Sequence, residues 1–479
     1  MNVADSVRWI AVSQAVRLGS QMLSLVVLAR VLPADAYGLM AMAMTVTNLA
    51  FLFRDLGTMV AIIQRPRLSE MLKCSLYWLN LGMAVALALL LAVTAIPIAH
   101  AYQEPRLAGV LAALALVFPL SGLTAVQQAL LERESRFRLL ARIEAVSALG
   151  GLSVALAAAW YGAEVWSLVL QMLAGTGLTA AQLLKASPWR PRRRYAWRAV
   201  RQVVGFSGHF SLFQLLGYVQ RNADSMLIGR LFGSAALGVY AMAFKVLLFP
   251  LQHITAVASR ALVPAMSRCQ DAPERLAELY LRSSGMMALL AAPLMAGLYA
   301  LREPFILLAF GPRWIAAAAL MQWLAAVGLI QALSAIPGSV LLARGRSRQM
   351  LGLGMFGAAA QLAGYALTIG WGVTGIAASY CAASLLTLLP LSRAALKGLP
   401  LRAGDLVAEI AKPVGAAVVM MIVVSALHTD LARRGAGTAA AFWPCVLAGM
   451  LVYGGVLLLL RPRQLTMLRE RWALRGARP

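Results

Sequence analysis

Long apolar runs alternate with short polar connections along almost the whole chain. Fourteen of these runs contain about 20 mostly apolar residues, the length that a helix needs to cross the hydrocarbon core of a bilayer. Their approximate limits are Val7–Leu32, Tyr37–Ile63, Leu72–Ala99, Leu107–Leu131, Leu139–Trp160, Val165–Leu184, Val204–Phe232, Leu237–Leu262, Leu279–Leu301, Trp314–Ala343, Met350–Trp371, Val373–Leu391, Ile410–Leu427 and Ala439–Leu460. The pattern predicts an all-α polytopic membrane protein with about fourteen transmembrane helices.

Composition supports this class. Of 479 residues, 61% are hydrophobic and only 13% are charged, a balance that excludes the soluble classes. The net charge of +25 could indicate a nucleic-acid partner. However, the basic residues lie in short clusters between apolar runs, so no nucleic acid is expected. The four cysteines share no metal-ligand spacing, and no metal or other cofactor is expected.

The positions of Lys and Arg predict the orientation. If the amino terminus, every second loop and the tail lie on one side, that side carries 32 Lys and Arg residues and the other side carries 7. Cytoplasmic loops are enriched in these residues. Both termini are therefore expected in the cytoplasm.

One phrase occurs in both halves of the chain. Residues 29–46 and 229–246 are identical at seven of eighteen positions, at an offset of 200. The copies lie at equivalent places, spans 1–2 and spans 7–8, so they share one orientation and predict two parallel six-helix bundles. A weaker repeat pairs Gln128–Arg136 with Ser339–Ser347. We expect lobes at 1–184 and 204–393, a basic cytoplasmic linker at 185–203, and helices 13–14 with a basic tail at 394–479.

The linker has two interpretations. Its core, ASPWRPRRRYAWRAVRQ (Ala186–Gln202), is basic, broken by proline and contains three aromatic residues. It could be a lipid-binding amphipathic segment that joins two moving lobes. It could equally be an ordinary positive-inside loop with aromatic anchors at the membrane interface.

Polar residues inside the spans are concentrated in spans 1, 2, 7 and 8. Because charges in a membrane are costly, they usually mark function. We expect them to line a cleft between the bundles that binds an anionic substrate, since guanidinium groups clamp phosphate and lysine adds a point charge. The predicted substrate-binding residues are Arg17, Arg54, Arg221, Lys245, Gln21, Asn48, Gln214 and Gln252, and Asp55 and Asp224 are candidates for ion coupling.

Structural interpretations of the same residues remain open. Arg221 and Asp224 are three residues apart and could form an ion pair within one helix. Asp55 could meet a neighbouring helix. Arg17 and Lys245 have no partner within their own helices. Glu144 is close to Arg142, which favours a surface pair.

Four segments carry a family resemblance. They are DLGTMVAIIQRPRLSE (Asp55–Glu70), QQALLERESRFRLLARIE (Gln127–Glu144), GAEVWSLVLQ (Gly162–Gln171) and RNADSMLIGRLFGSAALGVYAMAFKVLLFPLQ (Arg221–Gln252). The chain resembles the Wzx-type polysaccharide flippases, in the branch of colanic-acid and succinoglycan exporters. These belong to the multidrug/oligosaccharidyl-lipid/polysaccharide exporter superfamily.

The resemblance implies a function. It implies two lobes that work by alternating access in the bacterial inner membrane and flip undecaprenyl-diphosphate-linked oligosaccharide to the periplasmic leaflet. It also implies membrane lipids as surroundings, with polysaccharide polymerase and export machinery as candidate partners. In related peptidoglycan-precursor flippases, cationic residues on spans 1, 2 and 8 face the cavity, and the residues in like places here are Arg17, Arg54 and Lys245.

Two other functions are considered. A cation-coupled drug or lipid exporter of the same superfamily would have an acidic cleft. A membrane glycosyltransferase or polymerase would need catalytic acids or a large outer loop, and the chain has no DxD motif and only short outer loops. No phosphate-binding GxxxxGK[ST] loop occurs either. We therefore expect a transporter and no enzyme.

Overall fold

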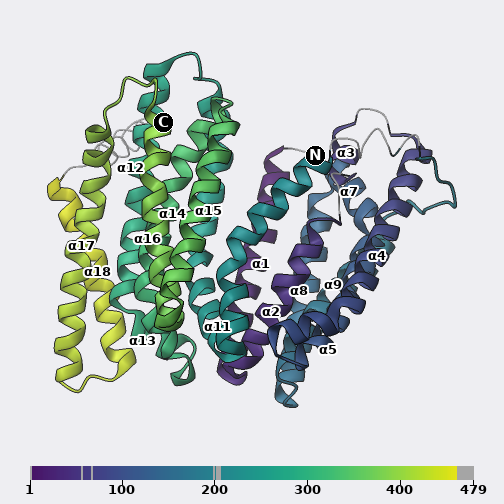
Figure 1. The fold of residues 1–479 in the computed structure, drawn as a ribbon, viewed down its shortest axis with the longest axis horizontal. Helices are drawn as coiled ribbons and strands as arrows, with labels where there is room; N and C mark the ends of the chain where they lie inside the picture. The colour runs from purple at the N-terminus through teal and green to yellow at the C-terminus, as the bar shows by residue number, and fades with distance from the viewer. Residues whose placement is uncertain (1–2, 55–57, 66–67, 198–199, 201–206, 461–479) are drawn as a thin grey trace. The chain divides into compact units, whose positions relative to one another are not determined.

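The computed structural model describes residues 3–54, 58–65, 68–197, 200 and 207–460, and within these residues it contains helices and no strand. This confirms the predicted all-α class. The chain forms two compact units, Met1–Ala241 and Met242–Pro479. Each unit is a set of long helices joined by short turns (Figure 1).

The first unit begins with nine helices. They are α1 (Val3–Val31), α2 (Ala34–Phe51), α3 (Thr58–Gln64), α4 (Glu70–Tyr102), α5 (Arg106–Ala115), α6 (Val117–Gly122), α7 (Ala125–Arg133), α8 (Phe137–Trp160) and α9 (Val165–Ala186). Predicted span 2 corresponds to α2 with α3, and predicted span 4 to the broken series α5, α6 and α7. Helix α8 packs between α1 and α9.

Helix α11 (Ser207–Ser267) contains the residues of predicted spans 7 and 8. A kink at Gly233, with φ of 82° and ψ of −179°, replaces the expected loop between these spans. Only glycine adopts this backbone conformation readily. Residues up to Ala241 belong to the first unit. The predicted lobe limits at 1–184 and 204–393 remain a prediction.

The second unit continues with α12 and the helices after it. They are α12 (Pro273–Ala300), α13 (Arg302–Ala309), η1 (Pro312–Trp314), α14 (Ala316–Ala343), α15 (Ser347–Thr368), η2 (Ile369–Trp371), α16 (Gly372–Leu396), α17 (Ala403–Arg433) and α18 (Thr438–Leu460). The last two correspond to predicted spans 13 and 14. Helix α17 packs along α12 and α18 packs on α17. The Tyr453 hydroxyl on α18 donates to the Leu289 carbonyl on α12 at 2.9 Å.

Among the described residues, nine helices are long and apolar enough to cross a membrane. The bent pair Arg106–Gly122 and Ala125–Arg133, with an angle of 43°, would add a tenth. Two of the nine, Gly217–Leu247 and Ser347–Leu396, each contain residues of two predicted spans. Predicted span 1 lies in α1, whose apolar part is Leu18–Val31. The polytopic membrane fold is therefore confirmed, and the figure of fourteen spans remains a prediction.

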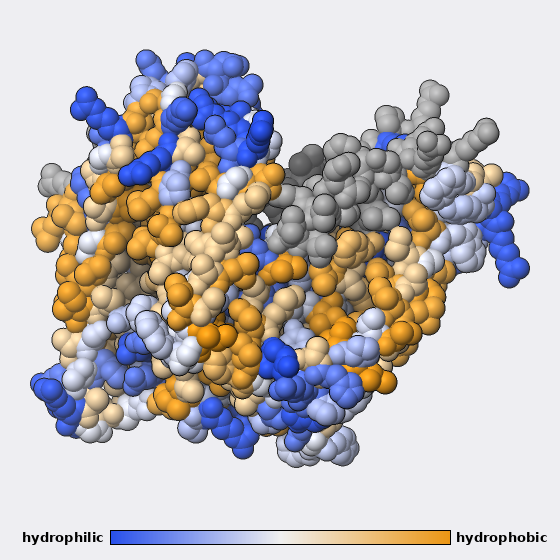
Figure 2. Space-filling model, viewed as in Figure 1, coloured by the Kyte–Doolittle hydropathy of each residue, from blue (hydrophilic) through white to orange (hydrophobic). Residues whose placement is uncertain are grey.

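The outer surfaces of both units suit a lipid environment. Figure 2 shows hydrophobic residues along the flanks of the helices and hydrophilic residues gathered near the helix ends. Large apolar side chains such as Val93, Leu367 and Leu459 are at least 75% exposed. Exposed apolar surface on this scale is unfavourable in water and favourable in a bilayer.

The two copies of the repeated phrase contact each other. A Cβ atom added at Gly38 would lie 1.6 Å from the carbonyl oxygen of Ser234, and one added at Gly238 would lie 1.8 Å from that of Ala34. Residues 34 and 234, like 38 and 238, are equivalent positions of the repeat. Since each copy presents the same surface to the other, the contact has local two-fold symmetry. Small residues four apart allow membrane helices to approach this closely.

The weaker repeat has a different register from the one in the sequence. A hydrogen bond from Arg136 N to Leu131 O, 3.0 Å long, closes the turn after α7. The turn after α14 is closed in the same way, from Arg346 N to Leu341 O at 2.9 Å. These turns correspond at a spacing of 210 residues, one less than the paired phrases imply. The pairing of Gln128–Arg136 with Ser339–Ser347 is therefore wrong by one residue, because it follows residue identities and not the equivalent turns.

We predict that Gly238→Ala destabilises the protein by about 1–3 kcal/mol, because the new methyl group forces α2 and α11 apart. The measurement is the thermal unfolding midpoint of the purified protein in detergent. Gly82→Ala on α4 is the matched control, since a Cβ there meets nothing within 4 Å. It should leave stability unchanged or raise it by up to about 1 kcal/mol. Equal midpoints for the two variants would contradict the close contact.

Candidate functional site

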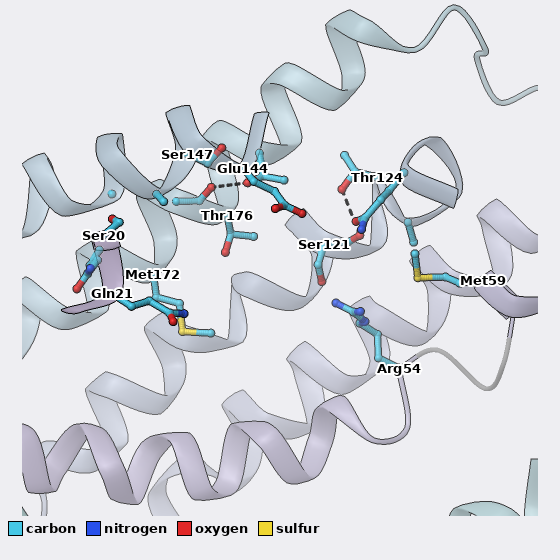
Figure 3. A pocket seen from close by; sticks show the side chains of 17 residues that line it. Ser20, Gln21, Arg54, Met59, Ser121, Thr124, Glu144, Ser147, Met172 and Thr176 are labelled. Atoms are coloured by element: carbon cyan, nitrogen blue, oxygen red, sulfur yellow. Dashed lines mark hydrogen bonds between the residues drawn. The ribbon is translucent and has the colours of Figure 1, made fainter. Parts of the chain in front are cut away.

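A polar cavity of about 530 Å³ lies within the first unit (Figure 3). Its walls come from α1, the turn after α2, α3, α6, the start of α7, α8 and α9. The polar lining residues are Ser20, Gln21, Arg54, Ser121, Thr124, Gln128, Glu144, Ser147, Gln171, Thr176 and Thr179. Such a group of hydroxyl, amide and charged side chains is unusual between apolar helices and indicates a binding site.

The lining residues place the cavity toward the predicted cytoplasmic end of the unit. Arg54 follows the last turn of α2, and Gln128 is in the first half of α7, which ends five residues later at Arg133. Glu144 is in the second turn of α8, and Thr179 is in the second half of α9. With the amino terminus in the cytoplasm, all four positions are near the cytoplasmic surface. Ser20 and Gln21, in the middle of α1, mark how far the cavity extends into the membrane.

Arg54 is held by an aromatic pair. Its guanidinium carbon lies 5.1 Å from the centre of the Phe51 ring. Phe51 in turn stacks on the buried Phe118 at 4.6 Å between ring centres. A guanidinium over an aromatic face is attracted by the ring quadrupole. This support positions the cation at the cavity wall.

Hydrogen bonds between helices fix the cavity walls. The side chains of Ser24 on α1 and Gln171 on α9 bond at 2.8 Å, and Gln182 Nε2 on α9 donates to Ser147 Oγ on α8 at 3.1 Å. Helices α8 and α9 approach closely at Gly151, where an added Cβ would lie 2.8 Å from the Gln171 carbonyl oxygen. Interhelical polar bonds and small residues are the usual means of helix association in lipid.

Glu144 is a cavity residue that the sequence interpretation missed. Its proximity to Arg142 favoured a surface pair, whereas the structure places it in the lining. Figure 3 shows Glu144 and Arg54 pointing into the same space from opposite walls. Ser147, three residues after Glu144, also lines the cavity. The spacing of Glu144 and Ser147 on one helical face is the sequence signal that could have identified it.

Asp224 on α11 is buried among packed helices. Only 3% of the residue is exposed. Its carboxylate accepts a hydrogen bond from the Tyr240 hydroxyl at 2.6 Å and another from the Ser225 backbone N–H at 2.7 Å. Among the described residues no ion pair joins Asp224 to Arg221. The ion pair considered from the spacing is therefore absent, because a tyrosine beyond the Gly233 kink takes its place.

The other predicted site residues have varied positions. In the first unit Arg221 is exposed, with its guanidinium folded back over Gly217, and Asn48 on α2 is also exposed. Lys245 and Gln252 belong to the second unit and are exposed there. The side chains of Arg17 and Gln214 and the whole of Asp55 lie outside the described residues. Of the predicted set, the cavity brings Gln21 and Arg54 together.

A second polar cluster lies at the other end of the first unit, beside the Gly38–Gly238 contact. Arg106 bridges Glu104 at 2.9 Å and Asp35 at 3.1 Å, and the Ser234 hydroxyl donates to Glu104 at 3.2 Å. The hydrogen bond from Arg106 lowers the pKa of Glu104. This cluster is thus held at neutral pH and weakens as the pH falls below the ordinary glutamate pKa of about 4.3.

No three His, Cys, Asp or Glu side chains of the described residues are grouped so that they could hold a metal ion. The chemistry of the cavity is that of binding. A cation, a carboxylate, hydroxyls and amides surround a space large enough for a polar group.

The sequence matches one family model over residues 27–319, and the model's description is "Polysaccharide biosynthesis protein". The chain belongs to this family. The matched region includes every residue that lines the cavity except Ser20 and Gln21. It also includes both copies of the repeated phrase, residues 29–46 and 229–246.

Relatives and solved structures extend the comparison. The lipopolysaccharide biosynthesis protein WzxC of Escherichia coli K12 is 24% identical, over 71% of this chain and 69% of WzxC. The succinoglycan biosynthesis transport protein ExoT of Rhizobium meliloti 1021 is 28% identical, over 66% of this chain and 64% of ExoT. The lipid II flippase MurJ, in an inward closed conformation, superposes with a TM-score of 0.78 at 13% identity, over 95% and 99% of the two chains. This last likeness shows a shared fold.

We predict that Tyr240→Phe lowers stability by about 1–3 kcal/mol, because it removes a hydrogen bond to a buried carboxyl group. Thermal unfolding in detergent measures this loss. Tyr218→Phe serves as a comparison, since the Tyr218 hydroxyl donates to a backbone carbonyl, that of Thr45, at 2.7 Å. It should cost less, about 1 kcal/mol. An unfolding midpoint of Tyr240→Phe equal to that of the wild type would contradict a stabilising role for the Tyr240–Asp224 hydrogen bond.

Proposed function

We propose that this protein flips undecaprenyl-diphosphate-linked oligosaccharide repeat units from the cytoplasmic to the periplasmic leaflet of the bacterial inner membrane. Three observations support the proposal. The chain belongs to the polysaccharide biosynthesis protein family. Its relatives include a succinoglycan transport protein, and its fold is shared with a lipid II flippase. The Lys and Arg distribution supports an orientation with both termini in the cytoplasm.

The polar cavity of the first unit is the observation that carries the proposal. A lipid-linked oligosaccharide has three chemically different parts, and the cavity suits two of them. Arg54 can form paired hydrogen bonds with a diphosphate. Hydroxyl and amide side chains such as Gln21 and Thr176 can exchange hydrogen bonds with sugar hydroxyls. The prenyl chain needs no polar site, because it can remain in the lipid.

The cavity position supports capture from the cytoplasmic side. Arg54 lies near the predicted cytoplasmic surface, where the diphosphate of a newly made repeat unit is located. Glu144 faces the same space and repels a diphosphate. We therefore assign to Glu144 a competing role, in which it favours release of the anion from Arg54. Alternating access between two lobes would then carry the head group outward.

The remaining predicted residues complete the hypothesis. Arg17, Arg221 and Lys245 are proposed as further contacts for the substrate, with Asn48, Gln214 and Gln252. Asp55 is proposed for ion coupling. Asp224, which is hydrogen-bonded to Tyr240, is better suited to holding α11 together than to exchanging ions. A polysaccharide polymerase and export machinery are proposed as the partners that use the flipped product.

Replacement of Arg54 tests the function. In a strain that lacks the protein, Arg54→Gln should reduce export by roughly 10- to 100-fold, because hydrogen bonds to charged groups contribute about 1.5–3 kcal/mol. Mass spectrometry of extracted lipids should show complete undecaprenyl-diphosphate repeat units. Their inaccessibility to a periplasmic glycosidase would place them in the cytoplasmic leaflet. Arg54→Lys should retain part of the activity, since lysine supplies charge without the paired geometry.

Arg434→Gln is the matched control for Arg54, because Arg434 is an exposed residue after α17 that pairs with Asp430 at 2.8 Å. It should export normally. Normal export by Arg54→Gln, at equal membrane abundance, would refute the role of the cavity. Accumulation of truncated repeat units in the strain without the protein would instead mean that the protein adds a sugar, and would refute the flippase function itself.

Glu144→Gln tests the competing role of this carboxylate. It should bind undecaprenyl diphosphate about 5- to 10-fold more tightly than the wild type, because one nearby negative charge is removed. It should also export more slowly, because release is weakened. Affinity is measured by native mass spectrometry of the purified protein and export by surface polymer. Glu134→Gln is the control, because Glu134 is an exposed acid directly after α7 and outside the lining residues. Unchanged affinity of Glu144→Gln would remove Glu144 from the binding cycle.

A further inference from the structure

We propose that residues 185–197, here called the basic strap, bind the headgroups of anionic phospholipids in the cytoplasmic leaflet. The strap begins with the last two residues of α9 and lies beside the N-terminal part of α4 (Figure 1). Of the two interpretations open from the sequence, this favours a lipid-binding segment over an ordinary loop.

The strap is attached to one face of α4 by four hydrogen bonds. Trp189 Nε1 donates to Glu70 Oε2 at 3.0 Å, and Trp78 Nε1 donates to the Arg192 carbonyl at 2.9 Å. The Arg192 and Ala196 backbone N–H groups donate to Cys74 Sγ at 3.4 Å and Ser75 Oγ at 2.9 Å. These α4 residues, at positions 70, 74, 75 and 78, include pairs three and four apart, which lie on one face of a helix. The strap therefore has a defined course along the helix.

Aromatic packing strengthens this attachment. The Trp189 ring meets the Tyr77 ring edge to face, with 5.9 Å between their centres. Tyr77 is buried in a core that also includes Leu72, Leu76 and Leu130. Trp189 therefore packs on the interior of the first unit, and this contact holds the strap against α4.

The attachment uses the strap backbone and the Trp189 side chain, and it leaves the arginine side chains exposed. Arg192, Arg193 and Arg194 are exposed, and no ion pair among the described residues involves them. Residues 185–197 contain five cations and no Asp or Glu. The charge of Glu70 on α4 interacts with that of Arg192, but Glu70 is also bonded to Lys73 and Trp189. The three consecutive arginines therefore keep an excess of positive charge that requires an external anion or water. Clusters of four to eight cations next to a membrane helix are typical of anionic-lipid binding.

Exposed aromatic side chains indicate that the anion belongs to a membrane. Tyr195 is 50% exposed and Trp197 57% exposed, directly after the three arginines. Trp78 on the adjacent face of α4 is 36% exposed. Tyr and Trp are favourable at the level of the lipid headgroups, where one side of the ring is apolar and the other is wet. A soluble anion or an acidic protein would not account for these rings, whereas a bilayer surface accounts for both rings and charges.

The experiment measures phospholipid binding to the purified full-length protein in detergent by native mass spectrometry. Phosphatidylglycerol and phosphatidylcholine of equal chain length are added separately. The wild type should bind phosphatidylglycerol more tightly. The triple variant Arg192→Gln/Arg193→Gln/Arg194→Gln should bind it on the order of 10- to 100-fold more weakly, with phosphatidylcholine binding unchanged. The charge-retaining triple variant with Lys at these positions should bind as the wild type does.

A matched variant separates the strap from total charge. Arg136→Gln/Arg138→Gln/Arg142→Gln removes three exposed arginines from the same predicted side of the membrane. It should keep its phosphatidylglycerol affinity within about twofold. Equal losses in both Gln triple variants, or none in the strap variant, would overturn the proposal. Competition with undecaprenyl diphosphate provides the final arm: if this lipid, and not phosphatidylglycerol, depends on the three arginines, the strap is a substrate site and the proposal is wrong.

Discussion

Backbone contact between Gly38 and Gly238 is the constraint on which the first unit depends. Lipid provides no hydrophobic driving force between helices, so α2 and α11 must associate through close packing. A side chain at either glycine would occupy the space of a carbonyl group on the other helix. The same two helices meet again where the Tyr218 hydroxyl bonds to the Thr45 carbonyl, nearer the C-terminal end of α2. Together these contacts fix the direction of α2, and hence the position of Arg54 beyond its end.

Polar side chains have two roles around the cavity: some join neighbouring helices, and others line the space. Ser24 with Gln171, and Ser147 with Gln182, join neighbouring helices. These bonds fix the distance between the helices that form the cavity walls. Arg54 rests on the Phe51 ring, which stacks on Phe118, and a guanidinium is attracted by the face of such a ring. Polar side chains therefore both join the helices of the first unit and line its cavity.

The sequence predicts features that depend on local composition and fails where another helix intervenes. Long apolar runs and the repeated phrase identify a polytopic helical protein, because both signals come from contiguous residues. The i, i+3 spacing of Arg221 and Asp224 describes neighbours on one helix and says nothing of Tyr240, which reaches Asp224 across a kink. Likewise, the side of α8 that lines a cavity depends on α1, α7 and α9 being present, so Glu144 could not be distinguished from a surface residue.

The two copies of the repeat are alike where they pack and unlike where they carry chemistry. Gly38 and Gly238 are identical, and Ala34 and Ser234 are both small, because a contact with two-fold symmetry needs the same surface twice. At the same offset Gln21 corresponds to Arg221, and Thr45 to Lys245. A lipid-linked oligosaccharide has no two-fold symmetry, so residues that bind it have no reason to occur twice. The duplicated positions thus belong to the scaffold, and the polar residues that differ between the copies are where substrate recognition is to be sought.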